Sequence, residues 1–297
     1  MKIVISGSTG LIGSALVAHF RKTGHEVVRL VRTNSGSETD ALRWDPVSGV
    51  LESSRMEEAD AVIHLAGRNL TVGRWTKTIK AQIRHSRVHS TQFLSETLGR
   101  LRRPPKVLAS ASGIGIYGHR NAEILTEESA SGTGFLAEVC QQWESATAPA
   151  SEAGIRVAHL RFGVVLSSQG GALAKMLLPF KLGLGGTIGT GGQYWSWVSI
   201  NDTIRAIQHV LLTEKVSGAV NVVSPEAVTN HQFTRTLGFV LRRPTLLSMP
   251  AAVARIAFGE MAEAALLAST RVVPKKLLST GFVFEHTDLA EALRALL

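Results

Sequence analysis

Short apolar runs alternate with longer amphipathic segments along the first half of the chain. Each short run is typical of a buried parallel strand, and each longer segment repeats its apolar residues at helical spacing. This alternation predicts βαβ units, so we expect an α/β, Rossmann-type doubly wound parallel sheet with helices on both faces. The predicted strands are 2–6, 26–31, 59–65, 106–110 and 155–160, and the predicted helices are 13–23, 76–98 and 132–144.

The pattern changes after Val165, where the regular alternation stops. Residues 169–193 are very rich in glycine, so we expect turns and a loop-rich lid there. Most of the remaining C-terminal sequence has helical character. We therefore expect a doubly wound Rossmann-type domain at 1–165, to which 202–223 returns, and a smaller, mostly helical substrate or cap region at 166–201 and 224–297.

Local signals predict individual elements of this second part. Asparagine, aspartate and threonine cap helices because their side chains accept backbone N–H groups of the first turn. We expect Asn201-Asp202 to cap a helix that ends at Leu212, and Thr287 to cap the last helix. Short strands are expected at 219–223 and 281–284.

The turn between the first strand and the first helix carries three glycines in the segment GSTGLIG. A glycine pattern alone is weak evidence, but inside a βαβ unit it indicates dinucleotide binding. The first glycine permits a tight turn, the second lets the backbone approach a pyrophosphate, and the third lets the helix pack close to the sheet. A glycine-rich turn without a ligand is the alternative. The predicted phosphate-binding residues are Gly7, Ser8, Thr9, Gly10, Leu11, Ile12 and Gly13.

The end of the second strand bears on the choice of cofactor. NAD sites usually place an acidic residue here to bind the ribose 2′-hydroxyl, whereas an arginine suits the 2′-phosphate of NADP. This strand ends at Arg32, and Glu38 and Asp40 come too late in the chain to serve. We therefore predict NADP(H) in preference to NAD(H). The alternative is that Arg32 is a surface residue.

The GxxGxxG spacing resembles the short-chain dehydrogenase/reductase superfamily. Leu65-Ala66-Gly67 looks like that superfamily's NAG segment, and the resemblance implies that it lines the adenine-side pocket. The helix after this segment would pack along the nicotinamide side, so Gln82 and Arg87 would contact the cofactor. An exposed polar helix face is the alternative. The backbone at Val165 would approach the nicotinamide carboxamide.

Short-chain enzymes normally carry Tyr-x-x-x-Lys on the helix that this chain has at 132–144. The lysine lowers the pKa of the tyrosine, so that the phenol exchanges a proton near neutral pH. The two tyrosines of this chain, Tyr117 and Tyr194, have no lysine four positions later. On the helix itself the expected positions fall on Leu136 and Cys140, or on Phe135 and Val139 if the alignment shifts by one residue, so the pair is absent in either register.

This absence, together with several segments, resembles the atypical short-chain group known as an epimerase family, which has a small extra C-terminal domain. The resemblance covers nearly the full length. The segments that carry it include SGSTGLIG, RWDPVSG, DAVIHLAG, ASGIGIYG, CQQWE, GGQYWSWVSINDT and VVPKKLLSTGFVF.

Ser112 and Tyr117 are the remaining candidates for proton chemistry, because they follow the strand where the superfamily keeps its catalytic serine or threonine. Both hydroxyls can donate hydrogen bonds to a substrate carbonyl or hydroxyl. Substrate contact or packing alone is the alternative. We expect His64 and Cys140 to be core residues, since both lie in apolar segments. The alternatives are a histidine that titrates near neutral pH and a reactive thiol. Trp75, Trp195 and Trp197 lie beside glycines, which slightly favours the walls of an apolar substrate pocket over core filling.

Composition narrows the possible partners. The net charge of +9 suggests nucleic acid, but the basic residues are dispersed and a chain with only two tyrosines offers no stacking platform. No metal-ligand spacing is present. One cysteine fits a reducing cytoplasm, and no window reaches the roughly 18 apolar residues of a membrane span. We therefore expect a cytoplasmic protein without nucleic-acid or membrane partners, and a homodimer is possible.

These observations favour an NADP(H)-dependent short-chain oxidoreductase or epimerase-like enzyme that acts on a small-molecule substrate. The missing tyrosine and lysine motivate a rival from another class. That rival is a non-catalytic NADP(H)-binding protein that senses the cofactor or binds a partner.

Overall fold

A computed structural model describes residues 1–32, 40–71 and 73–297. Glu38 therefore lies outside the described residues. The main feature is an eight-stranded sheet in the order β13-β8-β6-β5-β1-β2-β3-β4, parallel except for the antiparallel pair of β3 and β4. The strands are β1 (Lys2–Ser6), β2 (Glu26–Val31), β3 (Ala41–Asp45), β4 (Val50–Leu51), β5 (Ala61–His64), β6 (Val107–Gly113), β8 (Arg156–Phe162) and β13 (Gly218–Val222).

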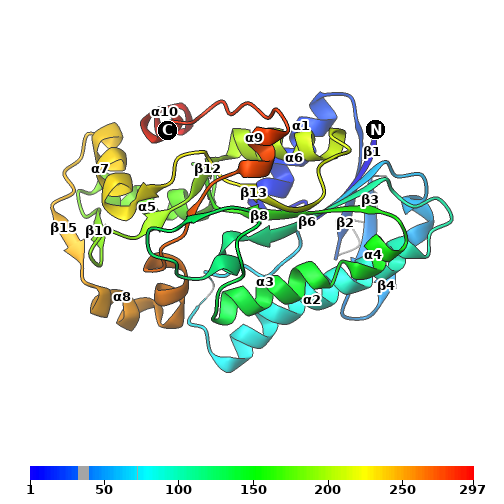
Figure 1. The fold of residues 1–297 in the computed structure, drawn as a ribbon, viewed down its shortest axis with the longest axis horizontal. Helices are drawn as coiled ribbons and strands as arrows, with labels where there is room; N and C mark the ends of the chain where they lie inside the picture. The colour runs from blue at the N-terminus through cyan, green and yellow to red at the C-terminus, as the bar shows by residue number, and fades with distance from the viewer. Residues whose placement is uncertain (33–39, 72) are drawn as a thin grey trace.

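Helices cover both faces of this sheet, so the predicted doubly wound Rossmann-type fold is confirmed (Figure 1). On one face α1 (Leu11–Lys22) and α6 (Ile200–Leu212) pack side by side against the apolar side chains of β1, β5, β8 and β13. The other face carries α2 (Lys77–Gly99), α3 (Phe135–Ser145) and α4 (Ala148–Glu152).

The strand order reverses at β1, which lies between β5 and β2. The chain leaves β1 for β2 and β3 on one side and returns to β5 and β6 on the other. Parallel strands that diverge in this way leave a crevice at their carboxyl ends. The predicted phosphate loop follows β1 and therefore lies at this crevice.

The smaller C-terminal part covers one end of the sheet with short elements. Its core contains buried Leu173, Trp195, Trp197 and Phe233. The helices are α5 (Gly171–Lys181), α7 (Asn230–Leu241), α8 (Ala251–Phe258), α9 (Lys275–Ser279) and α10 (Leu289–Leu296), with a π-helix at Ala262–Leu266. Four strand pairs complete it: β9 (Val164–Leu166) with β12 (Trp197–Ser199), β10 (Gly186–Ile188) with β15 (Leu247–Met249), β11 (Tyr194–Trp195) with β14 (Val228–Thr229), and β7 (Ile124–Leu125) with β16 (Arg271–Val272).

The glycine-rich segment 169–193 is more regular than predicted, because it contains α5 and β10. Leu173 and Phe180 of α5 are buried in the cap core, and this apolar face stabilises the helix despite the glycines at its ends. The prediction of a loop-rich lid was therefore wrong for this segment.

Two predicted caps and one predicted strand were also wrong. Ser199, not Asn201, caps α6 by accepting the Asp202 N–H. The Asp202 carboxylate is fully buried and accepts the backbone N–H groups of Glu285 and His286. The segment 281–284 is a loop instead of a strand, and the last helix is capped by Asp288, which accepts the Glu291 N–H, in place of Thr287.

His64 at the end of β5 is fully buried, as predicted for a core histidine. Its Nδ1 lies 2.7 Å from Ser6 Oγ, and its ring packs edge-on against Trp44. Burial lowers the pKa of His64 from 6.5 to about 3, so the folded protein holds this imidazole neutral.

We predict that His64→Gln flattens the pH dependence of stability. The unfolded chain, in which histidine has a pKa of about 6.5, binds a proton that the folded protein rejects, so the free energy of unfolding falls as the pH is lowered from about 6.5. In the wild type this term reaches about 1.4 kcal/mol per pH unit, and the variant lacks it. Urea unfolding of both proteins between about pH 4.5 and 7.5 measures the two slopes, and equal slopes would contradict the prediction.

Candidate functional site

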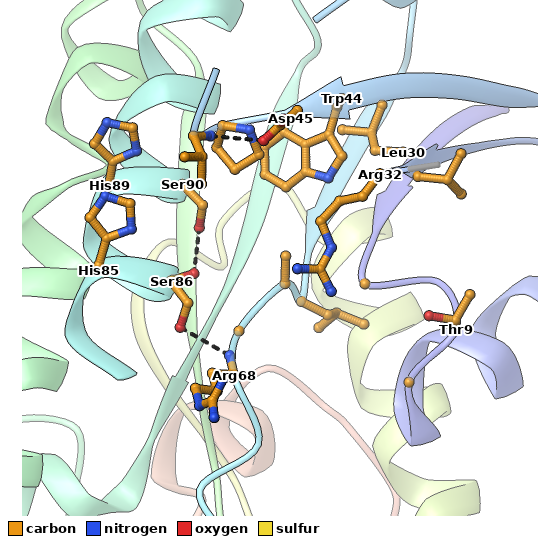
Figure 2. A pocket seen from close by; sticks show the side chains of 18 of the residues that line it. Thr9, Leu30, Arg32, Trp44, Asp45, Arg68, His85, Ser86, His89 and Ser90 are labelled. Carbon is orange, nitrogen blue, oxygen red and sulfur yellow. Dashed lines mark hydrogen bonds between the residues drawn. The ribbon is translucent and has the colours of Figure 1, made fainter. Parts of the chain in front are cut away.

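A cavity of about 1200 Å³ opens at the carboxyl ends of β1, β2, β3 and β5, with α2 as its opposite wall (Figure 2). A second cavity of about 300 Å³ lies on the other side of the phosphate loop. Gly7, Gly10 and Leu65 line both cavities. The two cavities therefore flank the phosphate loop at the switch point of the sheet, and together they are called the groove below.

The glycine loop is built by close backbone contacts. Gly7 has a φ of +67°, and a Cβ there would lie 2.8 Å from the carbonyl carbon of Leu65. A Cβ at Gly13 would lie 2.2 Å from the Gly7 carbonyl oxygen, so α1 can approach the sheet only with glycine at this position. At Gly10 the same carbonyl oxygen, 3.3 Å away, is the only atom within 4 Å among the described residues. Gly10 therefore faces the space of the groove.

This loop fits an anionic group. No described side chain caps α1, so the N–H groups of its first turn are directed toward the groove. Ser8 Oγ is buried and has no hydrogen-bond partner among the described residues. Ser8, Thr9, Leu11, Ile12 and the three glycines all line one or both cavities. A phosphate could satisfy these donors.

Arg32 lies at the wall of the larger cavity, directly after β2, and its side chain points into the cavity (Figure 2). Asp40 is engaged elsewhere, because it pairs with Arg29 at 3.1 Å and with Arg21. The acidic residue that does line the cavity, alone among its described lining residues, is Asp45 at the end of β3. Its carboxylate accepts Ser48 Oγ and the Val47 N–H, which lower its pKa.

The helix α2 supplies the opposite wall, where Gln82, Ser86 and the stacked rings of His85 and His89 line the cavity. Ser86 Oγ accepts the Arg68 N–H at 3.0 Å and so holds the loop after β5 against α2. Leu65, Ala66 and Gly67 of this loop line the larger cavity.

Arg87 lies outside the groove, contrary to its predicted role as a cofactor contact. It is nine per cent exposed, and its side chain lies behind Gly67, where it donates to the Ile83 carbonyl oxygen and stacks over Trp143. Gln82 and Ser86 share one helix face, and position 87 is rotated away from it. Burial lowers the pKa of Arg87 to about 10.

The smaller cavity has apolar walls, which include Ala111, Phe162 and the predicted Val165. The first residues of α5, Gly171 and Ala172, close it from the cap side.

Ser112 and Tyr117 belong to one buried network rather than to a cavity wall. Ser112 Oγ donates to Glu144 Oε1 at 2.7 Å, and Glu144 accepts two further hydrogen bonds from Arg161, each of 2.8 Å. Arg161 Nη1 also donates to Tyr117 Oη, which in turn donates to Asn221 Oδ1 at 2.7 Å. Tyr117 is fully buried, and burial raises its pKa despite the neighbouring guanidinium.

These contacts leave Tyr117 unavailable to a substrate in this structure, because its hydroxyl is enclosed and bonded on both sides. Cys140 is also a core residue, as expected. It packs against Gly113 beneath the end of β6, and burial raises its pKa to about 11. Position 140 of α3 is therefore occupied by an inert thiol.

The three tryptophans fill cores, so the prediction that they form a pocket wall was wrong. Trp75 is buried with Ile83 and Met261, and Trp195 and Trp197 are buried in the cap core. None of the three lines either cavity of the groove.

Sequence reasoning missed Trp44 and Asp45 because β3 was not predicted. The alternation of Leu42, Arg43 and Trp44, buried on one side and exposed on the other, was the available signal. It also missed Arg68 and the pairing of Glu144 with Arg161, which no spacing rule connects. Within the described residues no group of three metal-ligating side chains occurs, and no helix is long and apolar enough to cross a membrane.

A doubly wound sheet, a glycine loop at its switch point and a cap over its carboxyl ends define a Rossmann-type protein of the short-chain class. The chain belongs to the NAD dependent epimerase/dehydratase family, whose model matches residues 3–223. Residues 249–296 match a domain of unknown function, DUF1731.

Relatives match over nearly the whole length. The epimerase family protein MT2273 of Mycobacterium tuberculosis is 41% identical over 98% of this chain and 96% of its own. The crystal structure of human epimerase family protein SDR39U1 with NADPH superposes with a TM-score of 0.91 at 32% identity, covering 100% of this chain and 99% of that one. A nucleoside-diphosphate sugar epimerase from Corynebacterium glutamicum gives a TM-score of 0.82 at 36% identity, covering 100% of this chain and 58% of that chain.

We predict that Glu144→Ala lowers the free energy of unfolding by about 3 kcal/mol or more, because it leaves the Arg161 guanidinium buried without its partner. Burial alone would raise the pKa of Glu144, but the bonds from Arg161 outweigh it and lower the pKa. Glu144→Gln should cost less, since an amide oxygen still accepts one bond. Glu138→Ala removes an exposed pair on the same helix and should cost under about 1 kcal/mol. Similar losses in Glu144→Ala and Glu138→Ala, measured by urea unfolding, would refute this role.

Proposed function

We propose that this protein is an NADP(H)-dependent oxidoreductase or epimerase-like enzyme that acts on a small-molecule substrate. The observation that carries the proposal is the pair of cavities that flank the phosphate loop at the switch point, the larger of which is lined by both the glycine loop and Arg32. The NADPH found in the similar human structure supports the choice of cofactor. A cytoplasmic location is part of the proposal and rests on the single cysteine.

In this proposal the larger cavity takes the adenosine half of the cofactor and the smaller cavity takes the nicotinamide. The first turn of α1 and Ser8 bind the pyrophosphate, and Arg32 binds the 2′-phosphate. The segment Leu65-Ala66-Gly67 contacts the adenosine side, and Val165 borders the nicotinamide. Gln82 would contact the adenosine side instead of the nicotinamide side that the resemblance implied, because it lines the larger cavity. A bound nicotinamide supplies or accepts a hydride.

We propose Ser112 as the proton-handling group. Ser112 lines neither cavity in this structure, but it directly follows Ala111, which lines the smaller cavity, and its hydroxyl donates to the carboxylate of Glu144. Tyr117 would act only through Arg161, because it reaches no cavity in this structure. Without a lysine to lower a tyrosine pKa, turnover at neutral pH should be slow, or the substrate must supply its own acid or base.

A second candidate function is non-catalytic binding of NADP(H), as a cofactor sensor or a partner-binding protein. The observation that favours it is the enclosure of Tyr117 and Cys140, which leaves the expected proton-donor positions without a titratable side chain that reaches the groove. Cofactor binding is common to both candidates, so it is tested first.

We predict that NADPH binds at least about tenfold more tightly than NADH, because a charge-assisted contact from Arg32 to the 2′-phosphate exceeds the roughly 1.4 kcal/mol that this ratio needs. Arg32→Ala should bring the two affinities close together, whereas Arg100→Ala, an exposed arginine at the end of α2, should not. Calorimetric titration measures the affinities for both cofactors. Equal affinities in the wild type would reject the proposed role of Arg32.

Gly10→Val fills the space for the pyrophosphate and should abolish binding of either cofactor in a folded protein.

We predict that Ser112→Ala reduces turnover by about a hundredfold, the usual contribution of a positioned proton donor. Tyr117→Phe and Cys140→Ser should keep most of the activity, since both groups are enclosed. Steady-state rates with any substrate found by NADPH oxidation provide the measurement. Loss of activity in Cys140→Ser alone would overturn the assignment. Unchanged rates in all three variants would favour the binding-protein candidate.

A further inference from the structure

The cap ends in a basic, leucine-bearing surface, here called the cap tip. It consists of the exposed leucines at the end of α5 and the start of β15, and of the cations beside them. Its members are Leu178, Lys181, Leu182, Leu184, Arg242, Arg243, Leu246 and Leu247. Figure 1 shows β15, β10 and α7 at one end of the long axis of the molecule, far from the N-terminus.

Backbone contacts hold the two loops of the cap tip side by side. Arg243 Nε donates to the Lys181 carbonyl oxygen at 2.8 Å, and β10 pairs with β15 directly after the loops. The five leucines are between 51% and 90% exposed. Apolar side chains exposed together in this way indicate a contact surface.

The two segments that form the cap tip carry charge of one sign. Residues 153–201 and 227–259, which contain the whole cap tip, have no aspartate or glutamate, although the chain has 23 acidic residues elsewhere. None of Lys181, Arg242 and Arg243 forms an ion pair within the described parts of the chain. The surface therefore complements a partner that is both anionic and apolar.

Exposed leucines flanked by cations distinguish three kinds of partner. A second copy would bring the same cations face to face. A protein partner is disfavoured because leucine is under-represented in binding hot spots, which are rich in tryptophan and tyrosine, and the cap tip has neither. Leucines flanked by lysine and arginine are the combination that enters the interface of a bilayer with anionic lipids.

We propose that the cap tip docks on an anionic lipid bilayer, with its leucines in the interfacial region and its cations on the headgroups. This surface is separate from the groove, so it adds to the proposed function and does not depend on it. The expectation of no membrane partner rested on the absence of a spanning segment, which peripheral docking does not require. The clustering of leucines and cations is visible only in the fold.

Sedimentation of the full chain with vesicles tests the proposal. We expect binding to phosphatidylcholine vesicles that contain about one third phosphatidylglycerol, weakening with salt, and none to phosphatidylcholine alone. Leu182→Ser/Leu246→Ser and Lys181→Gln/Arg242→Gly should each bind at least about tenfold more weakly. Arg242 ends α7 at a φ of +55°, so glycine is well tolerated there. The exposed Leu212→Ser and Arg100→Gln are matched controls outside the cap tip and should bind like the wild type.

Affinity for NADPH and the unfolding midpoint should stay unchanged in all variants, which separates this result from failure of the proposed function or of folding. Absence of vesicle binding, or equal binding to neutral vesicles, would overturn the proposal. A dimer in solution that Leu182→Ser/Leu246→Ser dissociates would assign the cap tip to a second copy and would also overturn it.

Discussion

The groove depends on how closely the backbone packs where β1, α1 and β5 meet. A side chain at Gly13 would collide with the Gly7 carbonyl, and one at Gly7 would collide with Leu65. Because both side chains are absent, α1 begins directly beside the sheet edge and directs its first turn into the crevice. Gly7, Gly10 and Leu65 border both cavities. These two backbone contacts, of Gly13 with Gly7 and of Gly7 with Leu65, therefore position both halves of the proposed cofactor site.

On α3, where short-chain enzymes usually carry a tyrosine and a lysine, this chain has a buried polar network around Glu144. In this chain α3 turns Val139 and Cys140 into the core and uses Glu144 to hold Arg161 and Ser112. A buried carboxylate and guanidinium are stable here because each is matched by two direct bonds and by neutral hydroxyls. The network joins α3 to β6 and β8, so it organises the floor near the smaller cavity.

The sequence signals for a helix cap near residue 200 and for a cationic side chain on α2 were assigned to the wrong residues, because contacts with distant parts of the chain engage the predicted side chains. Asp202 has the side chain of a helix cap, yet it binds the backbone at Glu285 and His286, and Ser199 takes the cap. Arg87 has the charge expected of a cofactor contact, yet the helix rotation directs it behind Gly67. Helix and strand propensities contain no information about such long-range pairs.

The sequence by itself determined the parallel strands, the helices between them, the phosphate loop and its position after β1. These features follow from apolar periodicity and from glycines at fixed spacing, which act over a few residues. Tertiary structure decided which polar groups reach the groove: it enclosed Tyr117, exposed Arg32 and brought Asp45 and His85 to opposite walls. It also gathered the leucines and cations of the cap tip from two distant segments. Burial and proximity arise only when elements far apart in the chain pack together, so no local pattern can specify them.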